Sequence, residues 1–202
     1  MRKHLAFLLA AAVPFLILAG MAADQLRVVA KGRPIRVQVV PVDPMSLFQG
    51  EYARLGYDFS SMDQTRLKEL GAPEELPVKK GDRVWVLLRP GADGLWRTVG
   101  LELSGPPSLD GGAVALRAEV ALYSSWVGKD WDPKENRERG PPVRHTNLNL
   151  RAGLESFFVP QGEADRLEHT TGTGDVTAEI SVLPSGRAAV KRLFVKGQEL
   201  PF

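Results

Sequence analysis

The feature that most constrains this chain is an apolar run close to its N-terminus. Residues 5–23, LAFLLAAAVPFLILAGMAA, contain no charged side chain. About 20 apolar residues are needed for a helix to cross the hydrocarbon core of a bilayer. A cleaved signal peptide is the rival interpretation, because Arg2 and Lys3 precede the run and small residues end it. The length of the run favours a retained anchor, so residues 1–30 are expected to form the membrane anchor and juxtamembrane segment.

The charges around the apolar run bear on its orientation. Arg2 and Lys3 precede it, whereas several basic residues, among them Arg27 and Lys31, follow it. A very short basic head followed directly by an apolar run normally stays in the cytoplasm. We therefore expect a single-pass protein whose C-terminal domain, residues 31–202, lies outside the cytoplasm.

The composition of the remainder excludes several classes of function. With 202 residues, of which 44% are hydrophobic, the chain can bury the core of one domain. The net charge of +2 comes from Arg2 and Lys3, since the rest of the chain has 24 basic and 24 acidic residues. A neutral domain argues against nucleic-acid binding, which requires a concentrated basic face. The absence of cysteine excludes disulfides and thiol nucleophiles.

Alternating apolar residues predict a β-rich domain. Residues 35–39 and 113–123 alternate as half-buried strands do, and residues 83–103 and 176–195 each read as a hairpin around a Gly/Pro turn. Helices are expected over residues 60–70, which end at a glycine, and residues 163–168. Together these elements predict a mainly antiparallel sandwich or open barrel with one or two short helices.

A spaced motif follows the first expected strand: Gly50, Glu51, Tyr52, Leu55 and Tyr57. Alternation beyond the glycine places Leu55, Tyr57 and two neighbours, Ala53 and Phe59, on one face, with Tyr52, Arg54 and Asp58 on the other. The motif, with a Pro-x-Asp-Pro at residues 41–44 just before it, resembles the GDYXXLXY family of membrane-anchored bacterial proteins. Ser46-Leu47-Phe48 stands where the family has an Asp-Leu-Phe-like run, and Glu51 replaces the usual Asp.

The resemblance implies a location more than a chemistry. It implies a protein of the bacterial cytoplasmic membrane with its domain on the periplasmic side, and the family has no assigned activity. Such proteins are often encoded beside multi-spanning membrane proteins, which implies a multi-spanning partner. Residues 157–163 resemble a second recurring stretch of the family, so we expect them to lie beside the Tyr52 strand.

These observations predict one binding surface. Its expected members are the carboxylates, one tyrosine and one phenylalanine that the two stretches supply: Asp43, Glu51, Tyr52, Asp58, Phe158 and Glu163. Structural roles in turns and on polar strand faces also explain the carboxylates. His145 and His169 lack the spacing of metal ligands, so we expect neither a metal site nor a cofactor.

A local likeness to type I signal peptidases offers an enzymatic alternative. Ser61-Met62 precedes the strand at residues 83–89, as the nucleophile of those enzymes precedes a similar strand. The general-base lysine would stand at Arg97, and a guanidinium cannot deprotonate a serine at neutral pH. We therefore expect Ser61 to cap the helix at residues 60–70.

Residues 124–144 interrupt the pattern of strands. They contain nine charged residues, two tryptophans and three prolines, which is too polar for a core element. They are expected to form either a partner-docking loop, with Trp126 and Trp131 at its centre, or a solvated excursion.

The sequence thus predicts a membrane-anchored, non-enzymatic accessory or assembly partner of a larger membrane protein. The alternatives are an anchored hydrolase that uses Ser61, and binding of a small envelope ligand by Glu51, Tyr52 and Phe158.

Overall fold

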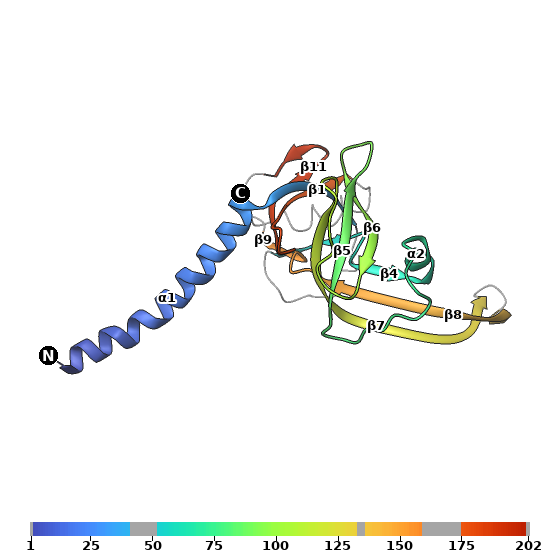
Figure 1. Ribbon diagram of the computed structural model, residues 1–202, viewed down its shortest axis with the longest axis horizontal. Coiled ribbons are helices and arrows are strands. Elements are labelled where there is room, and N and C mark those ends of the chain that lie inside the picture. Colours follow the sequence, from blue (N-terminus) through green and yellow to red (C-terminus); the bar gives the residue numbers. More distant parts are fainter. Residues whose placement is uncertain (1, 41–51, 133–135, 159–174, 201–202) are drawn as a thin grey trace.

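The computed structural model describes residues 2–40, 52–132, 136–158 and 175–200. A long helix, α1 (Arg2–Lys31), leads directly into a β domain (Figure 1). Residues 12–31 of α1 are long and apolar enough to cross a membrane by length and composition, a test that a signal sequence also passes. Few of their side chains are buried in the protein. The expected N-terminal apolar helix is therefore confirmed.

Within the described residues, twelve strands and one short helix follow α1. Their bounds, in chain order, are β1 (Arg33–Val40), β2 (Tyr52–Arg54), β3 (Gly56–Tyr57), β4 (Ser61–Asp63), α2 (Gln64–Glu69), β5 (Arg83–Pro90), β6 (Trp96–Glu102), β7 (Val114–Asp132), β8 (Arg137–Arg151), β9 (Ser156–Phe158), β10 (Val176–Val182), β11 (Ala188–Val195) and β12 (Gln198–Glu199).

Most strands belong to one large sheet, in the order β12-β11-β10-β1-β6-β5-β7-β8-β4, with β3 also paired to β1. Neighbours are antiparallel except β1 and β6, which are parallel, so the sheet is mixed. The sheet curls until the β10–β11 turn reaches β7, where the Arg117 amide donates to the Gly186 carbonyl at 2.9 Å. The predicted β-rich class is confirmed, and both predicted hairpins form as β5–β6 and β10–β11.

The core lies on one face of the curled sheet. Alternate residues of the strands point into it, as Val84, Val86 and Leu88 of β5 do. Leu55, Tyr57 and Phe59 are all fully buried there, so the face predicted for them is confirmed. Burial of apolar side chains on one face, with polar ones on the other, fixes the register of the strands.

The helix expected over residues 60–70 is wrong at its start. Ser61 belongs to β4, which pairs with β8, and Met62 is fully buried. α2 begins at Gln64, where the Asp63 carboxylate accepts a hydrogen bond from the Arg66 amide at 2.8 Å. Asp63, and not Ser61, is therefore the cap, because pairing with β8 holds Ser61 in an extended conformation.

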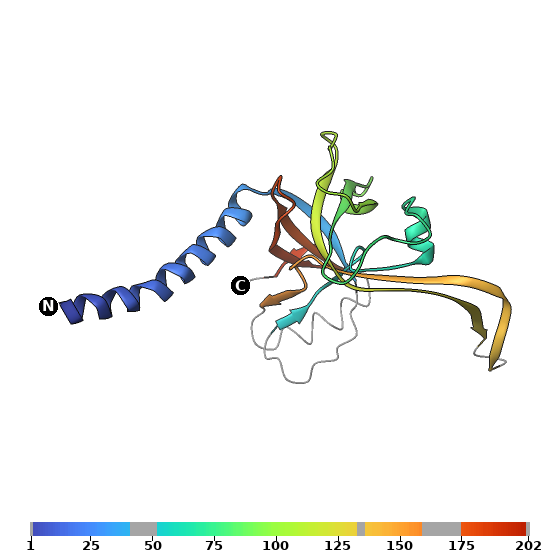
Figure 2. The same cartoon turned by 60° about the horizontal axis from the view of Figure 1, so that its bottom comes forward.

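The expected break at residues 124–144 is also wrong. β7 continues to Asp132 and β8 starts at Arg137, so the two strands form a ribbon that projects from the sheet, away from α1 (Figures 1 and 2). Among the described strands, no third strand pairs with β7 beyond Glu119 or with β8 before Asn147. A ribbon outside the core buries neither face, so it needs no alternation of apolar residues.

The junction between α1 and the sheet is tight. Val28 is buried, and the buried Ser181 hydroxyl of β10 donates to the Val29 carbonyl at 3.1 Å, which satisfies a backbone group at the helix end. A Cβ on Gly32 would lie 2.7–2.9 Å from backbone atoms of Val28, Ser181 and Val182. Only glycine permits this approach, so α1 meets the sheet without a flexible linker.

Candidate functional site

The two family-like stretches lie side by side in the backbone. β2 and β9 form a separate two-stranded sheet in which Tyr52 is opposite Phe158 and Arg54 is opposite Ser156. The expected proximity of the two stretches is therefore confirmed. The backbones of residues 52 and 158 share one position of the ladder.

The second half of the motif is built into the core. The Leu55 amide donates to the Glu155 carbonyl at 2.9 Å, and the Tyr57 hydroxyl donates to the Leu154 carbonyl at 3.0 Å. Leu55 and Tyr57 thus tie the motif to the turn that precedes β9. The spacing Leu-x-Tyr places both side chains on the buried face, which explains why these residue types stand there.

Burial controls the chemistry of Tyr57. The side chain is fully buried, stacks on Phe59 with ring centroids 5.0 Å apart, and has its hydroxyl bonded to a backbone carbonyl. Burial raises the pKa of Tyr57 far above its usual range, and the negative charge of Glu155 adds to the effect. The phenol is therefore a structural donor and is no candidate for acid-base chemistry.

Asp58 is engaged with neighbouring elements. Its Oδ2 accepts a hydrogen bond from the Thr98 amide of β6 at 3.0 Å and lies 3.9 Å from Arg66 Nη2 of α2. Arg66 Nη2 in turn donates to the Thr98 carbonyl at 3.0 Å. Asp58 therefore links the motif to both β6 and α2.

The structure describes only part of the predicted binding surface. Asp43, Glu51 and Glu163 lie outside the described residues, as does the helix expected at residues 163–168. The backbones of Tyr52 and Phe158 are together, and Asp58 has the contacts given above. A shared binding role for the six residues stays a prediction.

The residues of the hydrolase alternative do not form a catalytic pair. Ser61 is exposed on β4, and its hydroxyl makes no hydrogen bond within the described part of the chain. Arg97, where a lysine base would be needed, forms a two-bonded ion pair with Asp93 at 2.6 and 2.8 Å. That contact raises the pKa of Arg97, which moves it further from any role as a base.

His145 belongs to the ribbon. Its ring stacks on Trp126 with centroids 4.1 Å apart, and its Nε2 is 3.3 Å from the Gly128 carbonyl oxygen. His169 lies outside the described residues. Among the residues that the structure describes, no three His, Asp or Glu side chains cluster as metal ligands would.

Three exposed apolar side chains lie along one face of the ribbon, with polar residues, among them Ser124 and Asn147, between them. Leu122, Trp126 and Val143 are 48%, 54% and 38% exposed, and the strand register places them on the same face. On the opposite face, at the end of the ribbon nearest the sheet, the Leu76 amide donates a hydrogen bond to the Tyr123 hydroxyl at 3.1 Å. We call Leu122, Trp126 and Val143 the ribbon stripe.

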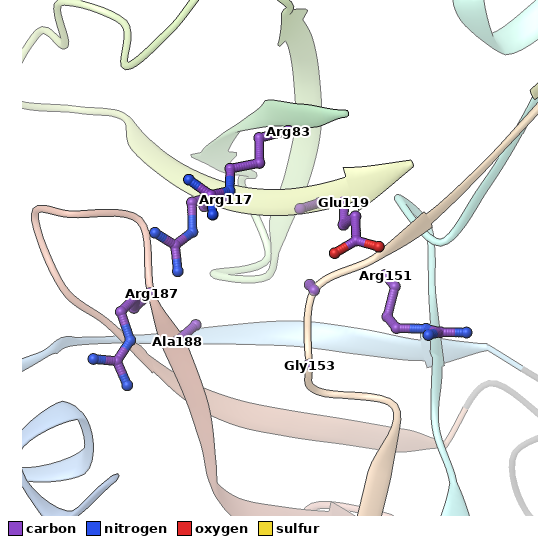
Figure 3. A pocket seen from close by; sticks show the side chains of 9 residues that line it. Arg83, Arg117, Glu119, Arg151, Gly153, Arg187 and Ala188 are labelled. Carbon is purple, nitrogen blue, oxygen red and sulfur yellow. The ribbon is translucent and has the colours of Figure 1, made fainter. Parts of the chain in front are cut away.

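Four arginines that the sequence analysis did not single out surround a hollow of about 360 Å³: Arg83, Arg117, Arg151 and Arg187 (Figure 3). Glu119 is directly opposite Arg83 on one side and Arg151 on the other in the strand register. The arginines are up to about a hundred residues apart in sequence. Arg83, Arg117 and Arg151 lie in strands and Arg187 lies in the β10–β11 turn, positions that surface arginines in general share.

Comparison with known proteins identifies the family of the chain. The family model described as GDYXXLXY protein matches residues 14–193, from within α1 to β11. No curated protein and no solved structure matches the chain. The match covers the C-terminal part of the apolar helix and most of the β domain, so both belong to one family pattern.

Proposed function

The chain belongs to the GDYXXLXY family, and from its structure we propose that it is a membrane-anchored accessory protein whose ribbon docks on the extracytoplasmic part of a larger, multi-spanning membrane protein. α1 is the anchor, and the β domain lies on the periplasmic side of the bacterial cytoplasmic membrane. The observation that carries the proposal is the projecting ribbon with its exposed apolar stripe.

α1 restricts the domain to the bilayer surface. Its apolar part, residues 5–23, has the length of a span, and the residues that follow, Asp24 to Lys31, continue the same helix into the sheet. Eight helical residues rise about 12 Å, so the domain stands close above the headgroups. A protein held this way meets partners that are themselves in or at the membrane.

The ribbon has the properties of a docking element. Two-stranded hairpins are marginally stable alone, and this one leaves both backbone edges without a strand partner among the described strands. Such edges can pair with an extended segment of another protein. The stripe adds a tryptophan, which is the side chain most enriched at the centres of interfaces.

The position of the ribbon indicates where the partner is reached. α1 and the ribbon leave the domain at opposite ends (Figures 1 and 2). The ribbon therefore extends away from the point where α1 would enter the bilayer. A partner that it reaches must present a loop or domain outside the hydrocarbon core. The hydrolase alternative has less support, because Ser61 lacks a base.

Site-specific photo-crosslinking tests the proposal. A photoreactive amino acid replaces Val143 in the full chain, and crosslinked products are identified after extraction from the native membrane. The expected product is a single multi-spanning membrane protein. In the same experiment Trp126→Ser is expected to reduce the yield about 10-fold or more, because removing a central interface tryptophan costs at least about 2 kcal/mol.

A matched control distinguishes binding through the ribbon stripe from nonspecific hydrophobic association. Val99 and Leu109 are 45% and 41% exposed, similar to the stripe, but they lie outside the ribbon. Val99→Ser and Leu109→Ser should leave the yield unchanged. Crosslinks only to a second copy of the chain, or equal losses in the control variants, would contradict the proposed role.

A further inference from the structure

The hollow among the four arginines is shaped by the β10–β11 turn. Gly186 has φ +76°, and a Cβ there would lie 2.2 Å from the ring of Trp85 and 3.0 Å from Arg117 Cβ. Glycine therefore lets the turn press onto the outer face of β5 and β7. The pressing turn brings Arg187 to the same hollow as Arg117 (Figure 3).

Positive charge in the hollow exceeds negative charge. Arg187 binds Asp24 of α1 through two hydrogen bonds, of 2.8 and 2.5 Å. Within the described part of the chain, no carboxylate lies within ion-pair distance of Arg83, Arg117 or Arg151, although Glu119 shares the hollow. Four arginines thus line the hollow together with one carboxylate, Glu119, and Arg187 also binds Asp24; the Arg151 side chain extends away from the other three (Figure 3). Arginine side chains that line a hollow are suited to phosphate, which can accept two parallel hydrogen bonds from one guanidinium group.

With α1 anchored as proposed above, one side of the hollow lies near the membrane surface. Asp24 is the first residue after the apolar run, so in a spanning helix it lies where hydrocarbon gives way to headgroups. Arg187 touches Asp24 directly and also lines the hollow. Small residues, Ala118, Ala152, Gly153 and Ala188, form the rest of the lining and leave space beyond a bare phosphate.

We propose that the hollow lined by Arg83, Arg117, Arg151 and Arg187 binds the phosphate group of an anionic phospholipid. The proposal rests on the anchoring role of α1 in the proposed function, and it is independent of the ribbon and its partner. The shared chemistry would also accept a free phosphate, but the contact of Arg187 with Asp24 at the end of the apolar run favours the lipid.

Thermal unfolding of the full chain in neutral detergent micelles tests the site. Phosphatidylglycerol, phosphatidylcholine and inorganic phosphate are titrated separately, and the rise in Tm gives an apparent Kd, because a ligand that binds the native state raises its stability. Phosphatidylglycerol is expected to raise Tm in a saturable way. The other two are expected to have little effect.

Paired variants locate the binding. Arg83→Gln with Arg117→Gln is expected to raise the apparent Kd for phosphatidylglycerol about 10-fold or more, as charge-assisted hydrogen bonds are lost. Lys68→Gln with Lys80→Gln removes the same two charges from exposed positions outside the hollow. This control is expected to leave the Kd unchanged.

A gain-of-affinity variant keeps the test decisive if the arginine variants fail to fold. Asp24→Asn removes the carboxylate that neutralises Arg187 and is expected to lower the apparent Kd for phosphatidylglycerol. An unchanged or raised Kd would overturn the proposal.

Three further outcomes would also overturn it. They are equal effects of the two phospholipids, equal losses in the lysine control, and stabilisation by inorganic phosphate as strong as that by phosphatidylglycerol, which would assign the hollow to a soluble anion. None of these readouts involves the ribbon, so failure here and failure of the docking role are distinguishable.

Discussion

The Tyr57 hydroxyl donates to the Leu154 carbonyl at 3.0 Å, so two residues 97 positions apart hold the motif against the turn before β9. Both side chains are fully buried. The bond connects β3, at the end of the family motif, with the turn that leads into β9. Together with the hydrogen bond from the Leu55 amide to the Glu155 carbonyl, it holds the motif beside β9.

Loss of this bond is expected to destabilise the domain. Tyr57→Phe leaves the buried Leu154 carbonyl without its donor, which costs about 1–3 kcal/mol in the free energy of unfolding.

Leu55→Ala removes a fully packed side chain and is expected to cost about 2–5 kcal/mol. Tyr52→Ala is expected to impair recognition and leave stability intact. Thermal melts decide this, and a large loss for Tyr52→Ala with none for Leu55→Ala would reverse the assignment of the faces.

Alkaline pH is expected to weaken the fold through Tyr57. In the unfolded chain a tyrosine loses its proton near pH 10, whereas in the native protein burial raises the pKa of Tyr57 above that value. Above about pH 10 the native state therefore binds more protons than the unfolded state, and stability falls as pH rises. Chemical denaturation from about pH 8 to about pH 11 should show the advantage of wild type over Tyr57→Phe shrinking. A constant difference would contradict the burial of a neutral phenol.

The helix–sheet junction is expected to be intolerant of side chains. Gly32→Ala places a methyl group against three backbone segments, and overpacking of this kind costs about 1–3 kcal/mol. Gly111→Ala is the matched control, because nothing lies within 4 Å of a Cβ at that position. Thermal unfolding in micelles should show a lower Tm for Gly32→Ala alone. Equal effects of the two changes would mean that the junction is looser than described.

Membrane insertion of α1 can be checked directly. The protein is expected to stay in the membrane during alkaline extraction, and protease added to spheroplasts is expected to digest the domain. Release of a shortened soluble protein would identify a cleaved signal sequence. Full protection of the domain from the protease would reverse the orientation.

Ser61→Ala is expected to leave function intact. The hydroxyl has no base, and Asp63 is the residue that caps α2. Complementation of a deletion strain should therefore succeed, and a serine-reactive probe should not label the wild-type protein at Ser61. Labelling that depends on Ser61 would support the hydrolase alternative.

The strands could be predicted from the sequence where burial of one face makes apolar and polar residues alternate. β5, β6, β10 and β11 each expose one face to the core, and their apolar alternation predicted them. Prediction failed for residues 60–70 because the spacing of Met62, Leu67 and Leu70 fits a helix, while pairing with β8 makes the start of the segment a strand. Tertiary pairing outweighed local spacing there.

The ribbon, the hollow and the proximity of the two family-like stretches are hard to predict from a single sequence. The ribbon buries neither face, so its polar residues read as a loop, although its strands pair in register up to Asp132 and Arg137. The hollow among the four arginines forms because the β10–β11 turn folds back onto β5 and β7. Arg83 and Arg187 are far apart in the sequence and line the same hollow only in the folded protein. The proximity of the Tyr52 and Phe158 stretches was predictable only through the family resemblance.

The close packing of α1 against the sheet at Gly32 has a mechanical consequence. A helix that crosses a bilayer changes its tilt when the hydrocarbon thickness changes. Because Val28, Ser181 and Gly32 fix the last turn of α1 to the sheet, the domain cannot swivel independently of the helix. Any change in tilt is therefore carried through the whole body to the far end of the ribbon. If α1 spans the membrane as proposed, the reach of the ribbon above it is set by the thickness of the bilayer around α1.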